Sequence, residues 1–214
     1  MEPQDETQLA RAVLNGDTDA FEHFVEHFRS RIFRYSWLMC GSPEDAEEVA
    51  QETLLKVFQS IEQLREPERV RSWVFRIARN VCLMERRKSV FAPKEEVPVD
   101  ELPLADESEP ADSRLLQAEL RSVIERVVMD LPRTYRSVVL LRDLEGLSTE
   151  DTATVLDLRI DVVKTRLHRG RAAMREKLDC YVHNHCLEDQ ASPNPSPLTA
   201  EERSQLYSAW QQTV

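Results

Sequence analysis

Residues 148–178, STEDTATVLDLRIDVVKTRLHRGRAAMREKL, hold two helical patterns separated by a short break. Ser148 and the acidic residues of the next turn form a capping-box pattern, which predicts a short helix that ends near Asp157. After a tight connection, Asp161 can cap a second helix. One face of that helix is apolar or small and is predicted to pack inward; it comprises Val163, Leu167, Gly170, Met174 and Leu178. A short helix, a tight turn and a longer helix are typical of a helix-turn-helix.

The second of these helices is strongly basic. Residues 162–178 hold 6 basic side chains against 1 acidic side chain. Lys and Arg side chains on a helix in the major groove can bond guanine edges or phosphates. The alternative is a helical hairpin with a solvated basic face, which is the usual meaning of a charge run. The residues predicted to contact DNA are Lys164, Thr165, Arg166, His168, Arg169 and Arg171.

The rest of the chain also favours helices. Only 4 of the 214 residues are glycine, which argues against a sandwich or barrel because their tight turns rely on this residue. Ser42 and Pro43 predict a helix start, with the serine as N-cap and the proline in the first helical position. Pro132 opens another helix and Gly146 ends it. We therefore expect an all-α fold.

The predicted organisation is two small helical domains joined by an acidic, flexible linker, with the helix-turn-helix in the C-terminal domain. Residues 91–113 contain several prolines and carry a net charge of −7, which predicts an extended, self-repelling linker. The predicted domains are residues 5–90 and residues 114–179. Residues 180–214 are expected to form a C-terminal extension.

The net charge of the whole chain hides large differences between its segments. A net charge of −11 argues against a nucleic-acid binder when it is taken as an average. However, residues 64–90 carry 8 basic and 3 acidic side chains and form a second basic segment beside the one at 162–178. Two basic segments in an acidic background indicate two separate contacts with a polyanion, or two solvated helix faces.

The basic helix within residues 64–90 has an apolar stripe that is predicted to pack inward: Val70, Trp73, Val74, Ile77 and Val81. Its other face combines apolar and basic side chains, among them Phe75, Arg79 and Leu83. This combination suits single-stranded nucleic acid, where bases stack and phosphates pair with cations. The alternative is that Phe75 and Leu83 pack on another helix.

The helix that begins after Ser42 is acidic. Its inward stripe is predicted to comprise Ala46, Val49, Ala50, Thr53, Leu54, Val57, Phe58 and Ile61. The acidic side chains on its remaining surface can meet a basic protein partner. They can equally be solvated acids that the helix dipole favours near an N-terminus.

The C-terminal extension holds two cysteines and two histidines within seven residues: Cys180, His183, His185 and Cys186. Two thiolates and two imidazoles suffice for a tetrahedral Zn²⁺ site or for copper. The alternative is a fraying helix end, with no cofactor. The four cysteines of the chain show no disulfide framework, which fits reduced thiols in a cytoplasm.

Several other classes of protein are not supported. No glycine-rich phosphate loop, HExxH motif or nucleophile elbow is present, so we do not expect an enzyme. No apolar run reaches the roughly 18 residues of a membrane span. The acidic N-terminus lacks the apolar core of a secretory signal, and we expect a cytoplasmic protein.

Successive motifs resemble the extracytoplasmic-function class of bacterial RNA polymerase sigma factors. In the first domain, GDTDAFEHFVEHF, EDAEEVAQETLLKVFQSI and RVRSWVFRIARNVCLMERR are similar to parts of the sigma second region. In the second domain, LPRTYRSVVLLRDLEGLSTEDTATVL and VKTRLHRGRAAMREKL are similar to the fourth region. The resemblance covers about residues 5–179.

The resemblance implies a factor that directs core RNA polymerase to promoters and assists −10 melting, for example in a stress response. The acidic helix then binds the clamp coiled coil of the polymerase through Asp45, Glu48, Gln51, Glu52 and Lys56. The segment 62–87 corresponds to the −10 reader, with Arg71, Arg76, Arg79, Asn80, Arg86 and Arg87 as contacts. The helix-turn-helix corresponds to the −35 reader.

Further partners follow from the same resemblance. They are the polymerase flap, promoter DNA and, as a candidate, an anti-sigma factor. The acidic linker resembles the connector that runs through the polymerase channel.

At two positions of the turn the chain departs from the family pattern, with Asp157 in place of the usual glycine and Arg159 in place of a small capping residue. Asp tolerates the left-handed conformation better than most residues.

Two other functions remain open from the sequence. A helix-turn-helix regulator that binds an operator would need a dimer interface and no polymerase-binding helix. A metal- or redox-sensing switch would work through the C-terminal extension.

Overall fold

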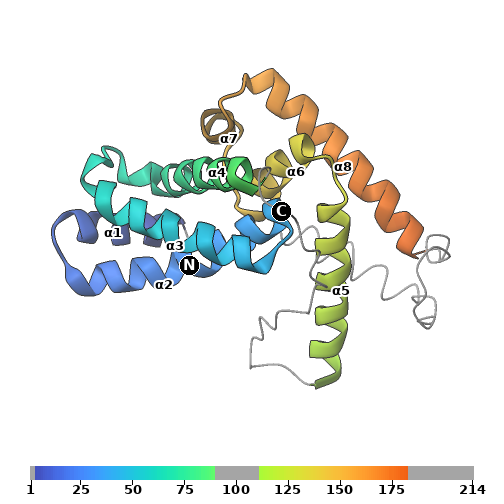
Figure 1. Ribbon diagram of the computed structural model, residues 1–214, viewed down its shortest axis with the longest axis horizontal. Helices are drawn as coiled ribbons and strands as arrows, with labels where there is room; N and C mark the ends of the chain where they lie inside the picture. The colour runs from blue at the N-terminus through green and yellow to red at the C-terminus, as the bar shows by residue number, and fades with distance from the viewer. Residues whose placement is uncertain (1–2, 90–110, 183–214) are drawn as a thin grey trace. The chain divides into compact units, whose positions relative to one another are not determined.

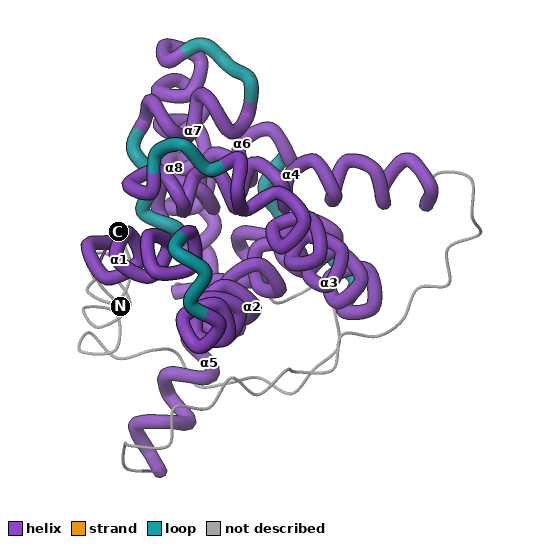
Figure 2. The backbone as a smooth tube through the Cα atoms, turned by 90° about the vertical axis from the view of Figure 1, so that its left-hand side faces the viewer, coloured by secondary structure: helices purple, strands orange, loops and turns teal. Residues whose placement is uncertain are grey.

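The computed structural model describes residues 3–89 and 111–182, and these residues form only helices and connecting loops (Figure 2). The first helices are α1 (Pro3–Leu14), α2 (Thr18–Cys40), α3 (Pro43–Ser60) and α4 (Val70–Ser89). Two 3₁₀ turns, η1 (Ile61–Gln63) and η2 (Pro67–Arg69), connect α3 to α4. The others are α5 (Ala111–Met129), α6 (Arg133–Val139), the short π-helix η3 (Leu140–Leu144), α7 (Thr149–Leu156) and α8 (Ile160–Val182). The prediction of an all-α fold is confirmed.

The chain divides into two compact units. One combines residues 1–99 with 147–163, and the other combines residues 100–146 with 164–214. The predicted linker lies almost wholly outside the described residues, and α5 begins at Ala111, three residues before the predicted start of the second domain. The predicted domain boundaries stay predictions.

In the first unit, α1 to α4 pack side by side around an aromatic core (Figure 1). Phe24 and Phe28 of α2 lie with their ring centroids 4.6 Å apart, and both are fully buried. The ring of Tyr35 meets that of Phe75 from α4 edge-on at 5.4 Å. Aromatic pairs in this arrangement stabilise a core beyond the area they bury. This core fixes α4 against α2.

Local sequence signals define the helix ends. Gly41 adopts φ 82° and ends α2, and its N–H donates to the carbonyl of Trp37. The Ser42 hydroxyl then accepts from the N–H of Asp45 at 3.2 Å, which confirms the predicted N-cap of α3. The Ser148 hydroxyl caps α7 in the same way, accepting from the N–H of Asp151 at 2.9 Å. It also donates to the Asp151 carboxylate at 2.6 Å.

The turn between α7 and α8 is closed by Asp157 in the left-handed conformation, with φ 54° and ψ 54°. The N–H of Leu158 donates to the carbonyl of Ala153 at 2.9 Å, and that of Asp157 donates to Thr154. These two bonds make a Schellman motif, the usual ending of a helix before a left-handed residue. The tolerance expected of Asp at this position is confirmed.

Asp161 is not the cap of α8, contrary to the prediction. The helix begins at Ile160, and the N–H of Val163 donates to the carbonyl of Arg159 at 3.1 Å. Arg159 therefore makes the first helical hydrogen bond and occupies the cap position. The Asp161 carboxylate lies in the first turn and accepts from the Arg159 guanidinium at 3.1 Å.

Replacing Asp157 by glycine is expected to raise the free energy of unfolding by about 0.5–1 kcal/mol, because glycine adopts the left-handed conformation without strain. Replacing it by valine is expected to lower the same quantity, since a β-branched residue is strained there. Urea denaturation of the three proteins measures both differences. Equal stabilities would contradict a strained turn.

In the second unit, which holds α8 from residue 164 onward, this helix packs on α6 at a point of close approach. A Cβ atom added at Gly170 would lie 2.8 Å from a methyl group of Val139, so only glycine fits without movement. Met174 and Leu178 are buried as the predicted stripe requires, and Leu167 is half-buried. Val163 of the same stripe is buried in the first unit. Near the far end of α8, Lys177 pairs with Asp130 at 3.0 Å. The inward face of α8 is thus the predicted one.

Candidate nucleic-acid interfaces

The exposed face of α8 carries most of the residues predicted to contact DNA. Lys164 and His168 are one turn apart on this face, and Thr165 and Arg169 form a parallel pair beside them. All four side chains are exposed. Arg175 continues the same face and is also exposed. The sequence prediction missed it, although its spacing from Lys164 and His168 indicates the same side of the helix.

Arg171 and Arg166 lie differently. Arg171 makes a two-pronged ion pair with Asp143 of η3, in which Nε lies 2.9 Å from Oδ2. The Asp143 side chain is only 2% exposed, so this pair fixes α8 to η3. Arg166 is half-buried on the flank of the basic face. A DNA contact by either residue stays a prediction.

A second exposed face runs along α4. Arg76, Asn80 and Leu83 lie three or four residues apart and are all exposed, which places them on one stripe. Arg86 is exposed beside it, and the side chain of Arg87 lies outside the described residues. We call Arg76, Asn80 and Leu83 the α4 stripe; it presents a cation, an amide and an apolar side chain. These groups can pair with a phosphate, bond a base edge and contact a base plane.

Arg79 and Phe75 do not belong to this stripe. The Arg79 guanidinium donates to Asn80 Oδ1 at 3.3 Å and to the carbonyl of Leu156 at 3.2 Å. Phe75 is fully buried against Tyr35, so packing on another helix, the alternative left open by the sequence, is its role. Leu83, in contrast, is 38% exposed and stays available for contacts.

Arg71 is committed to a buried carboxylate. Its Nε donates to Glu6 Oε2 at 2.8 Å. The other oxygen of Glu6 accepts from His27 Nε2 at 2.8 Å and from Arg31 Nη1 at 2.5 Å. This arrangement joins α1, α2 and α4, and the Glu6 side chain is only 2% exposed. Arg71 is therefore an internal anchor of α4, and its predicted DNA contact stays untested.

The ionisation of Glu6 reflects this environment. Burial alone raises the pKa of a carboxyl group, but hydrogen bonds from His27 and Arg71 and the charges of Arg71 and Arg31 outweigh it. The pKa of Glu6 is lowered to about 2. The carboxylate is therefore charged, and α1 is held to α4 by an ionic network.

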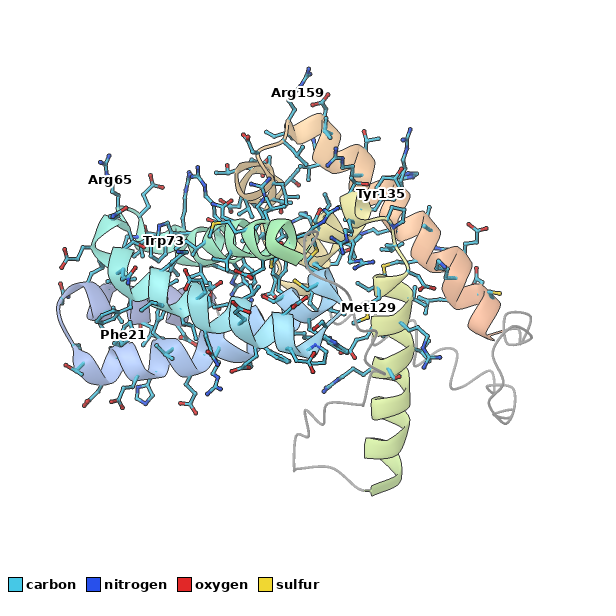
Figure 3. All side chains as sticks on the ribbon, in the orientation of Figure 1. Phe21, Arg65, Trp73, Met129, Tyr135 and Arg159 are labelled. Carbon is cyan, nitrogen blue, oxygen red and sulfur yellow. The ribbon has the colours of Figure 1, made fainter. Side chains whose placement is uncertain are left out.

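The same helix α1 reaches the connection that precedes α4. Arg11 forms an ion pair with Glu68 of η2. Arg65, in the same connection, projects away from the helices (Figure 3) and is exposed. The connection is thus supported from α1 while its basic side chain stays on the surface.

The third face lies on α3. Glu44, Glu48 and Gln51 are exposed and are followed on the same side by Leu55 and Phe58. The spacing alternates between four and three residues, the pattern of a helix that packs along another helix. Among the other predicted contacts, Asp45 is half-buried, and Glu52 pairs with Lys56 at 2.5 Å at the edge of this face. We call the five exposed residues Glu44, Glu48, Gln51, Leu55 and Phe58 the α3 stripe.

Phe58 corrects the sequence prediction, which placed it in the inward stripe. Its side chain is 60% exposed, and that of Leu55 is 50% exposed. The rings of Phe58 and Phe21 meet in an edge-type arrangement, with 5.3 Å between their centroids. Phe58 lies at the margin of the helical stripe, so periodicity alone did not decide its side. Exposed apolar residues that line up in this way often mark an interaction surface.

The predicted metal site falls mostly outside the described residues. His183, His185 and Cys186 are not described. Cys180 forms a disulfide, so the expectation that the four cysteines are reduced thiols is wrong for this residue. Within residues 3–89 and 111–182, no group of three or more metal-ligating side chains is found. Metal binding by the extension stays a prediction. In the same ranges, none of the helices has the length and apolar character that a membrane span needs.

Two known protein-family models match the parts of the chain that carry these faces. The family model for sigma-70 region 2 matches residues 24–90, and the model for sigma-70 region 4 matches residues 121–174. The α3 stripe and the α4 stripe lie within the first match. The basic face of α8 lies largely within the second.

Relatives match over most of the chain. The ECF RNA polymerase sigma factor SigW of Bacillus subtilis is 30% identical over 176 residues, which cover 78% of this chain and 94% of SigW. The ECF sigma factor SigE of Mycolicibacterium smegmatis is 32% identical over 187 residues, or 83% of this chain and 70% of SigE.

Two solved structures share the fold. CnrH in complex with the cytosolic domain of CnrY aligns with a TM-score of 0.56 at 22% identity, over 82% of this chain and 97% of that one. The sigma factor RpoE bound to the anti-sigma factor NepR, from Bartonella quintana, gives 0.58 at 20% identity, over 74% and 96%. Two sigma regions in order and relatives matched along most of their length show that the chain belongs to the ECF class of RNA polymerase sigma factors, which are transcription initiation factors.

Proposed function

We propose that each of the three exposed faces binds a different partner of a promoter-specific sigma factor. The α3 stripe binds core polymerase, the α4 stripe contacts the −10 element, and the basic face of α8 contacts the −35 element. The observation that carries this proposal is that all three faces are solvent-exposed and lie, in chain order, wholly or largely within the two matched sigma regions.

The chemistry of each face suits its partner. The basic face of α8 offers several cations and hydroxyl or imidazole groups along one side of a helix, which fits the major groove. The α4 stripe offers a cation, an amide and an apolar side chain, which fits a base turned out of the duplex. Extruding a base costs a few kcal/mol, and contacts in the protein offset that cost. None of these contacts makes or breaks a covalent bond, so we propose an initiation factor without enzymatic activity.

The α3 stripe favours a helical protein partner. Its first half is acidic and its second half is apolar, so the complementary surface is a helix or coiled coil with basic and apolar residues. This fits the clamp coiled coil of core polymerase better than an operator-binding regulator, which needs no such stripe. Because core polymerase acts in the cytoplasm, we propose the same location for this chain. The flap of the polymerase and an anti-sigma factor are further proposed partners, the latter supported by the complex of RpoE with NepR.

Replacing both Leu55 and Phe58 by alanine is expected to weaken binding to core polymerase by about tenfold or more, because truncating the central apolar anchors of an interface costs about 2 kcal/mol or more. Affinity is measured in the absence of DNA. The matched control is Leu83→Ala, which removes an exposed apolar side chain from α4 and is expected to leave this affinity unchanged. Wild-type affinity in the double variant would contradict the assignment of the α3 stripe.

A further inference from the structure

Two thiols meet where the end of α2 faces α4. The Cys82 Sγ donates to the Ser36 hydroxyl of α2 at 3.9 Å, and its residue is 7% exposed. Cys40 follows Ser36 by one helical turn on the same side of α2. The Cys40 and Cys82 thiols are also hydrogen-bonded to each other, and neither is in a disulfide. The two residues are far apart in the sequence, so only the fold brings them together.

We propose that Cys40 and Cys82 form a dithiol that a hydroperoxide converts into an intramolecular disulfide between α2 and α4. In the first step, the Cys40 sulfur attacks one peroxide oxygen and the O–O bond breaks. The thiol proton leaves with the other oxygen, as water when the oxidant is hydrogen peroxide, and Cys40 becomes a sulfenic acid. In the second step, the Cys82 sulfur attacks the Cys40 sulfur. The S–O bond breaks, and the Cys82 proton leaves with the hydroxyl group as a second water.

The surroundings assign different roles to the two thiols. Cys40 is half-exposed, so a small peroxide can reach it. Cys82 is buried, and both its hydrogen bond with Cys40 and its burial raise its pKa. A buried thiol that keeps its proton reacts poorly with peroxide from solvent. Cys40 is therefore the residue that is oxidised first, and Cys82 is the one that resolves the sulfenic acid.

The disulfide would tie together segments that carry two of the proposed interfaces. Cys40 immediately precedes Gly41 and the start of α3, and Cys82 lies next to Leu83 of the α4 stripe. The dithiol proposal stands on the packing of α2 against α4 and is independent of promoter recognition. It is distinct from the cysteines of the C-terminal extension.

The test uses the full chain with Cys180→Ser and Cys186→Ser, in which Cys40 and Cys82 are the remaining thiols. The reduced protein is treated with one equivalent of hydrogen peroxide, alkylated with N-ethylmaleimide and digested with trypsin. Cleavage after Arg34 and Lys56, and after Arg79 and Arg86, places the two cysteines on different peptides. We expect a linked pair of these peptides, two hydrogen atoms lighter than their sum, which reduction separates.

The proposal is overturned if both cysteines are recovered alkylated, if Cys40 is found as a sulfinic acid beside an alkylated Cys82, or if the links join two chains. A further variant, Cys40→Ser, tests the order of the steps without touching the buried residue. In that variant Cys82 is expected to stay reduced and to be alkylated only after unfolding. Oxidation of Cys82 at the wild-type rate would refute the role of Cys40.

Discussion

Replacing Glu6 by alanine is expected to lower the free energy of unfolding by about 3–5 kcal/mol, the usual cost of removing one partner from a buried ionic network. The Glu6 carboxylate is 2% exposed and accepts hydrogen bonds from α2 and α4. Its removal takes the negative charge from between two guanidinium groups, Arg31 and Arg71, which are 22% and 18% exposed. We expect the lower end of the range because these groups retain some access to water.

The measurement is urea denaturation of the wild type and of two variants. The matched control is Glu68→Ala, which breaks the ion pair with Arg11 on the surface, where both side chains are more than half exposed. Exposed pairs contribute about 0–1 kcal/mol. Equal losses of stability in the two variants would contradict the role of the buried network.

The same network predicts how stability depends on pH. The pKa of Glu6 is about 2 in the folded chain, below its ordinary value of 4.5. The unfolded chain therefore binds a proton first as the pH falls, so this stabilisation is present above about pH 4.5 and is lost progressively towards pH 2. Glu6→Gln removes the ionisable group and is expected to show a shallower loss of stability between pH 6 and pH 3. Parallel curves for the two proteins would contradict the network.

Replacing both Lys164 and Arg169 by alanine is expected to reduce transcription from a −35-dependent promoter by about 10²-fold. Both side chains lie on the exposed basic face of α8. A contact with a base edge contributes about 1–3 kcal/mol, so two lost contacts account for this reduction. Binding to core polymerase is expected to be unchanged, because the α3 stripe is intact. Transcription at fixed salt and core-polymerase affinity are measured in parallel.

The matched control for this pair removes the same charge from another helix of the same unit. Arg121 and Arg126 are exposed on α5, and their replacement by alanine is expected to leave promoter selectivity unaltered. An equal loss in both double variants would mean that net charge, and not the face of α8, determines promoter binding.

Signals that act within a few residues could be predicted from the sequence. The caps at Ser42 and Ser148, the ending at Asp157 and the inward stripe of α8 all depend on neighbours along the helix. The start of α8 was misjudged by two residues, because Asp161 has the side chain of a cap but the hydrogen bond begins at Arg159. Such errors are local and small.

Contacts between distant segments could not be predicted. Glu6 belongs to an acidic N-terminal block that looks like a solvated surface, yet its partner Arg71 lies 65 residues away. Arg171 looks like part of a basic face in the sequence, but its guanidinium is paired with the buried carboxylate of Asp143. The exposure of Phe58 and the meeting of Cys40 with Cys82 likewise depend on how whole helices pack. Charge patterns show which helices are basic, and only the fold shows which charges are already paired.

Promoter-specific initiation by this chain can be measured by run-off transcription with core RNA polymerase on a library of promoters. We expect the chain, added to core polymerase, to produce transcripts from a subset of promoters that share sequences at both the −10 and the −35 positions. Transcripts no more abundant than those of core polymerase alone, or initiation without regard to either sequence, would contradict this expectation.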